Sequence, residues 1–129
     1  MYLALQNINI MSEEKVQKPS VIKVCEETYP ETAAEFKKIL NEQYEMFCKK
    51  MLDYGPHNIS GGTTLETEDD VKFSLTGLFF RKNDKVQRLK QLVVLNKGNN
   101  VGESIDDTYQ DLSIYGIISQ IVKRKKWGK

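Results

Sequence analysis

Four acidic side chains within nine residues are the first feature of the sequence that could do chemistry. Glu103, Asp107 and Asp111 recur every four residues, so on a helix they project from one face. Carboxylate oxygens in such a row suit Mg²⁺, with Mn²⁺ possible in its place, because these cations take carboxylates, waters and substrate phosphates as ligands. The structural alternative is an N-terminal cap, since Ser104 heads a capping pattern and acidic residues such as Asp106 favour a first helical turn.

A second cluster is rich in cations. Arg81, Asp84, Lys85 and Arg88 lie within eight residues and occupy adjoining faces of a helix. In a functional reading, Asp84 binds the metal and the three cations hold phosphate oxygens, because Arg offers a planar fork and Lys a point charge. A solvated surface with salt bridges is the common alternative.

A third candidate lies in a loop that contains the only histidine of the chain. Tyr54 could stack on a base, and His57 and Asn58 could contact its edge, a sugar or a phosphate. The structural alternative is that these side chains are exposed on a loop and have no ligand. The chain has no Walker-type phosphate loop, no GxGxxG fingerprint and no Gly-x-Ser-x-Gly elbow.

Three long helices are expected to position these residues. The first begins near Thr32, at a Thr-x-x-Glu capping box, and ends before Gly55. An irregular loop over 54–66 precedes a second helix that starts at Thr67 and ends near residue 96, and a third starts near Ser104. Gly77 is a possible break in the second. The fold class predicted is therefore all-α, an antiparallel bundle of three to four main helices, which a homodimer or a higher homo-oligomer would complete because large apolar faces remain.

The two ends of the chain differ from the middle. Residues 1–31 are expected to be a poorly defined lead-in, with a weak possible strand at Val21–Val24, and residues 32–122 are expected to form the helical domain that carries the candidate residues. The tail, residues 123–129, holds five positive charges, whereas the rest of the chain carries about −4. We interpret the tail as a solvated, frayed helix end in preference to a site for nucleic acid or a partner.

Length and composition bound the class of protein. A chain of 129 residues with 40% hydrophobic and 29% charged residues corresponds to one globular domain. No apolar run approaches the roughly 20 residues of a membrane helix, and the start lacks the features of a secretory signal. Two cysteines without zinc-ligand neighbours are interpreted as reduced thiols, which predicts a cytoplasmic protein without membrane association.

The three chemical segments together resemble one family. The sequence reads Lys-x-x-Asp-Tyr-Gly at 50–55, Asp-Lys-x-x-Arg-Leu at 84–89, and Glu-Ser-Ile-x-Asp-Thr-x-x-Asp-Leu-x-x-Tyr at 103–115. In this order they resemble the nucleotide modification associated domain 1 family of phages, itself similar to the all-α NTP pyrophosphatases of the MazG and dimeric dUTPase group. The resemblance extends over roughly residues 33–122.

The resemblance implies a Mg²⁺-dependent hydrolase that converts a (d)NTP to (d)NMP and pyrophosphate in a phage nucleotide pool, with DNA modification as its context. Asp84, Asp107, Asp111 and Glu103 would bind the metal, with Glu103 and Asp107 catalytic. Phosphates would contact Lys85, Arg88 and Arg81, and the nucleoside would contact Tyr54, His57 and Asn58.

The acidic motifs depart from those of MazG enzymes, because cations stand where the first acidic pair should be and the second pair is spaced one residue further. The alternatives are a protein that binds or sequesters nucleotides without cleaving them, and a small interaction protein whose basic tail binds DNA or a partner.

Overall fold

The structure, a computed structural model, describes residues 20–129 and confirms the all-α prediction, since these residues contain helices and no strand. The described residues divide into two units, with the boundary between residues 41 and 42, and each unit is considered by itself. The part of the predicted lead-in before residue 20 lies outside the described residues.

The first unit contains a helix where the sequence suggested a strand. α2, Val21–Thr28, is capped by Ser20, whose hydroxyl accepts a hydrogen bond from the Lys23 amide at 3.2 Å. The strand at Val21–Val24 is therefore a wrong prediction. A four-residue stretch with three apolar residues fits either structure, and the cap together with the apolar residue Cys25 one turn on favours the helix.

α3, Pro30–Tyr54, runs from the first unit into the second. It begins two residues before the Thr32 cap that we predicted. Proline suits a first helical position because it has no amide hydrogen to leave unpaired, and the Ala33 amide already donates to the Tyr29 carbonyl at 3.0 Å. The helix ends as expected at Gly55, whose φ of +70° favours glycine.

The loop after α3 is more regular than its glycine content suggested. It holds a single helical turn, α4, His57–Ser60, which ends at Gly61 in the left-handed conformation. A side chain at Gly61 would collide with the ring of Phe73. Glycine is therefore needed here both for its φ and for the close approach of Phe73.

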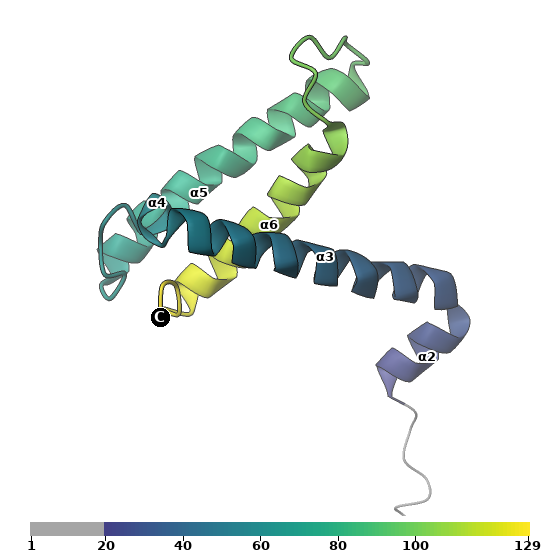
Figure 1. Cartoon of the computed structure of the whole chain (residues 1–129), viewed down its shortest axis with the longest axis horizontal. Helices are drawn as coiled ribbons and strands as arrows, with labels where there is room; N and C mark the ends of the chain where they lie inside the picture. The colour runs from purple at the N-terminus through teal and green to yellow at the C-terminus, as the bar shows by residue number, and fades with distance from the viewer. Residues whose placement is uncertain (1–19) are drawn as a thin grey trace, which may run out of the picture. The chain divides into compact units, whose positions relative to one another are not determined.

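Two long antiparallel helices follow and lie side by side (Figure 1). α5, Glu68–Leu89, continues through Gly77 without a break and ends in the π-helical turn η1, Lys90–Val94. α6 spans Ile105–Lys123. Both predicted caps are confirmed, because Thr67 accepts from the Asp70 amide and Ser104 from the Asp106 amide, each at 3.1 Å.

The hydrophobic core lies in the second unit, between α5, α6 and the C-terminal half of α3. Leu78 of α5 and Val122 of α6 are almost completely buried, and Phe47 and Met51 of α3 pack against the same cluster. No helix within residues 20–129 is both long enough and apolar enough to cross a membrane.

The basic tail is docked on the second unit, which contradicts the interpretation as a frayed end. Trp127 is 7% exposed, its indole N–H donates to the Pro56 carbonyl at 2.9 Å, and its ring meets Phe47 edge-on. The Lys125 and Lys126 amides donate back to the Val122 and Ile121 carbonyls, which is the Schellman pattern of a helix end. The free energy gained by burying the indole outweighs the electrostatic repulsion among the lysines of the tail.

Candidate functional site

Two of the three chemical segments, 50–55 and 103–115, line one cavity in the second unit together with Arg81. Its volume is about 260 Å³. The first segment contributes Lys50 and Tyr54, and the third contributes Asp111 and Tyr115. Arg81 comes from the second cluster, and Trp127 from the tail completes the wall. Aromatic rings and charged groups therefore face the same space.

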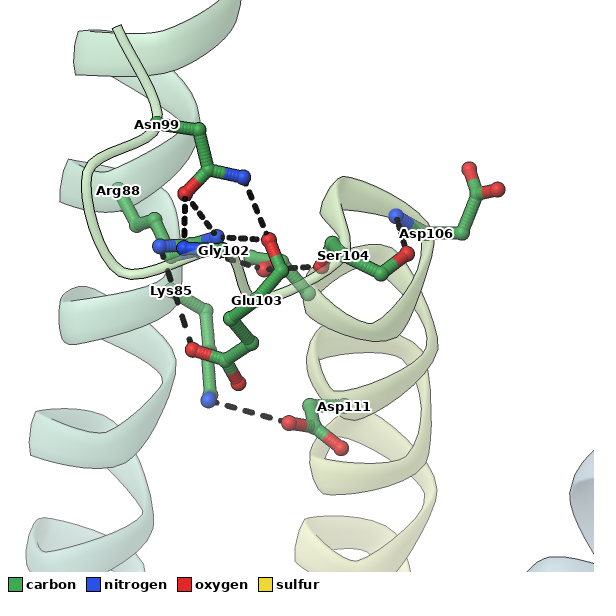
Figure 2. Close-up of polar contacts among 9 residues, drawn as sticks. Lys85, Arg88, Asn99, Gly102, Glu103, Ser104, Asp106 and Asp111 are labelled. Atoms are coloured by element: carbon green, nitrogen blue, oxygen red, sulfur yellow. Dashed lines mark hydrogen bonds and ion pairs between the residues drawn. The ribbon is translucent and has the colours of Figure 1, made fainter.

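Asp111 is the only carboxylate on the wall of this cavity, and it is held by two lysines. Its side chain is 20% exposed, and its oxygens lie 3.0 Å from Nζ of Lys85 and 3.6 Å from Nζ of Lys50. Lys85 reaches it from α5 across the gap to α6 (Figure 2). A carboxylate at a core boundary needs such partners, and here they are cations.

The charge of Lys85 is stabilised by its surroundings. Partial burial would lower the pKa of its ammonium, but the hydrogen bond and the charge of Asp111, with the charges of Glu103 and Tyr115, outweigh it and raise that pKa above its usual value. Lys85 is therefore a fixed positive charge at neutral pH.

Arg81 is oriented by two contacts. One guanidinium nitrogen donates to the Asn58 carbonyl at 2.8 Å, and the guanidinium carbon lies 5.9 Å from the centre of the Tyr115 ring, within the range of a cation–π interaction. These contacts hold the cation at the wall of the cavity.

Arg88 does not line the cavity, and its guanidinium binds other residues of the fold. Its Nε donates to the Thr108 hydroxyl at 3.0 Å, and Nη2 donates to the Glu103 carbonyl at 2.5 Å and to Asn99 at 3.5 Å. Nη1 lies 3.9 Å from the Glu103 carboxylate (Figure 2). The planar guanidinium thus ties the loop after η1 to the start of α6, and few of its donors remain for a phosphate.

The four predicted metal ligands are not gathered around one point. Asp84 and Asp107 are exposed, Glu103 is beside Arg88, and Asp111 is between the two lysines. Within residues 20–129 no group of three or more His, Cys, Asp or Glu side chains is arranged to hold a metal ion.

The predicted nucleoside contacts divide between two cavities. Tyr54 and Asn58 line the cavity that contains Asp111, whereas His57 lines a neighbouring one beside Pro56 and Lys129. Only Tyr54 and Asn58 therefore share a cavity with the cations Lys50 and Arg81.

Sequence reasoning missed Tyr115 of the aromatic wall and also Lys50 and Trp127. Lys50 lies four residues before Tyr54, and this spacing places both on one helix face. Trp127 is the only tryptophan of the chain and a residue type that is usually well buried. Because Trp127 follows a run of basic residues, the sequence reading assigned it to a solvated tail and did not use the tendency of tryptophan to be buried.

Comparison of the chain with models of protein families, with curated proteins and with solved structures found no match.

Proposed function

We propose that this protein binds a nucleotide in the cavity between α3, α5 and α6. The proposal depends on one observation: the walls combine the cations Lys50 and Arg81 with the aromatic residues Tyr54, Tyr115 and Trp127. A ligand with a flat ring and a charged phosphate chain matches both kinds of wall.

The phosphate end of the ligand would bind beside Asp111. Lys50 and Lys85 already converge there, because the carboxylate attracts both ammonium groups. Asp111 would orient the two lysines before the ligand arrives, which reduces the entropy lost on binding. A polyphosphate carries more charge than one carboxylate and would compete for the same ammonium groups.

The ring of the ligand would lie against the aromatic wall. Tyr54 is exposed at the rim and is free to stack on a base, a contact of roughly 1–3 kcal/mol in other nucleotide-binding proteins. Asn58 is also exposed on this wall, and its amide can both donate to and accept from a base edge.

Isothermal titration calorimetry with the eight common NTPs and dNTPs tests this proposal, first in EDTA and then with Mg²⁺. Lys50→Ala should weaken nucleotide binding about tenfold, as expected for a lost contact between an ammonium and a phosphate. Lys49→Ala is the matched control, because this adjacent lysine pairs with Glu45 at 3.0 Å and does not line the cavity. Equal affinities of the two variants would contradict the proposed phosphate position.

A Mg²⁺-dependent pyrophosphohydrolase is the second candidate, favoured by a carboxylate, Asp111, in the same cavity as the cations. Mg²⁺ often binds proteins through one or two carboxylates and takes its other ligands from water and substrate phosphates. A nucleotide could therefore bring the ion with it. The phage setting, the MazG-like bundle and the homodimer implied by the resemblance belong to this candidate.

A chromatographic assay of the same nucleotides separates the two candidates. Release of monophosphate and pyrophosphate that requires Mg²⁺ and is lost in Asp111→Asn would establish the hydrolase. Binding without product, in a protein that remains folded, would establish a nucleotide-binding or sequestering protein.

A further inference from the structure

A second cavity adjoins the proposed nucleotide site. Its volume is about 320 Å³, and it is lined by residues of α4 and α5 and by Gly61, all within the second unit. The two cavities share three residues, Asn58, Ile59 and Arg81. A ligand longer than a single nucleotide could therefore extend from the first cavity into the second.

The second cavity is an apolar groove with aromatic sides. Phe73 and Phe80 line it and are 63% and 60% exposed. Gly77 lies between them on the same side of α5, because positions 73, 77 and 80 follow helical spacing. A Cβ atom at Gly77 would have no neighbour within 4 Å apart from its own stretch of helix. The space over Gly77, between the two aromatic residues, is therefore open.

Both aromatic rings of the groove are restricted by contacts with their neighbours. The Phe73 ring lies against Gly61, where a Cβ atom would collide with it. The Phe80 ring meets Phe79 edge-on, with ring centres 5.7 Å apart. Exposed rings that are already restricted offer a surface on which a base can stack with little further loss of conformational entropy.

Arg81 lies where the two cavities adjoin, and its charge is available to a ligand. Its guanidinium has several N–H donors, and within residues 20–129 it makes a single hydrogen bond, to the Asn58 carbonyl at 2.8 Å. No carboxylate in this part of the chain pairs with Arg81, whereas Lys50 and Lys85 both pair with Asp111. A phosphate at this point would meet an uncompensated guanidinium, a group that often binds phosphate through two parallel hydrogen bonds.

We propose that the nucleotide in the first cavity is one half of a dinucleotide, in which two nucleosides are joined by a phosphate and the first carries a 5′-phosphate. This inference rests on the proposed nucleotide site. The 5′-phosphate and the first base occupy the cavity of Lys50 and Tyr54. The linking phosphate binds Arg81, and the second base lies over Gly77 beside Phe80.

Isothermal titration calorimetry at constant ionic strength tests the proposal. The ligands are pdApdA, pdCpdC, pdGpdG and pdTpdT, each compared with the deoxynucleoside 5′-monophosphate of the same base. For at least one base, the dinucleotide should bind the wild type about tenfold more tightly than the monophosphate, as expected when a second base stacks. Phe80→Ala should remove this advantage and leave the affinity for the monophosphate unchanged. Tyr109→Ala is the matched control, because this aromatic residue is 50% exposed and lines neither cavity.

Gly77→Leu is a second test that removes no aromatic ring. The leucine side chain would fill the open space over α5 and exclude the second base. Leucine also favours a helix more than glycine does, so the protein should remain folded. This variant should bind the dinucleotide and the monophosphate with equal affinity.

Binding of NTPs reports on the first cavity alone, so the two proposals can fail separately. If NTPs bind and no dinucleotide binds more tightly than its monophosphate, the nucleotide site stands and the dinucleotide is wrong. An advantage that survives both Phe80→Ala and Gly77→Leu would place the second base elsewhere and would also overturn the proposal. A 5′-phosphorylated octanucleotide that binds as tightly as the dinucleotide would identify the end of a single strand as the source of this unit, and one that does not bind would identify the free dinucleotide.

Discussion

Removal of the Trp127 side chain should destabilise the whole second unit, although only Gly128 and Lys129 follow this residue in the sequence. Its indole is 7% exposed, packs edge-on against Phe47 and donates to the Pro56 carbonyl at 2.9 Å. It also lines the cavity of the proposed site. The substitution Trp127→Ala therefore removes the indole ring from the core, together with the hydrogen bond that the indole N–H donates to the Pro56 carbonyl.

The expected loss can be divided into two parts. Truncation of a buried aromatic residue to alanine costs about 3–5 kcal/mol of the free energy of unfolding. Trp127→Phe keeps most of the packing but loses one hydrogen bond, which costs about 1 kcal/mol, because the Pro56 carbonyl still accepts from the Ile59 and Ser60 amides. Lys126→Ala, at the exposed neighbouring position, should change the free energy of unfolding by less than about 0.5 kcal/mol.

Urea unfolding followed by far-ultraviolet circular dichroism measures all three variants without needing the tryptophan signal. The order of stability should be Lys126→Ala, then Trp127→Phe, then Trp127→Ala. If Trp127→Ala unfolds at the same urea concentration as the wild type, the tail is solvated and the docked tail is wrong.

Three further predictions follow from other contacts. Leu78→Ala, at a side chain 1% exposed, should cost about 3 kcal/mol of the free energy of unfolding in urea. Lys125→Gly should raise that free energy by about 1 kcal/mol, because Lys125 has a φ of +57° that glycine adopts without strain. The pKa of Lys85 is raised in the folded protein, so its ion pair contributes stability that is complete below about pH 10.4, the pKa of an unfolded lysine. This contribution is lost as the pH rises through the pKa of Lys85 in the folded protein. The melting temperature should therefore fall over this pH range in the wild type, and Lys85→Met should not show that fall.

Local signals predicted the long helices well. The caps at Thr67 and Ser104 and the stop at Gly55 are marked by residues close in sequence, so periodicity and capping rules place these ends. The errors came where short signals compete: Val21–Val24 fits a strand as well as a helix, and Pro30 begins α3 ahead of the capping box at Thr32.

The site was harder to predict because it depends on contacts between distant residues. Helical spacing alone groups Asp107 with Asp111, but Asp111 is turned toward lysines from two other helices. Arg88 looked suited to phosphate, and its fork instead binds Asn99, Glu103 and Thr108. No local pattern indicates which partner a long charged side chain selects after packing.

The indole N–H of Trp127 offers the most direct test of the proposed nucleotide site, because the chain has one tryptophan and it lines the cavity. In a ¹H–¹⁵N correlation spectrum it gives a single indole resonance, which can be followed while a nucleotide is added. We predict that this resonance and the amides of Lys50 and Tyr54 shift together and saturate. If they stay in place at millimolar nucleotide for all eight common NTPs and dNTPs, with the protein folded, the cavity does not bind nucleotides.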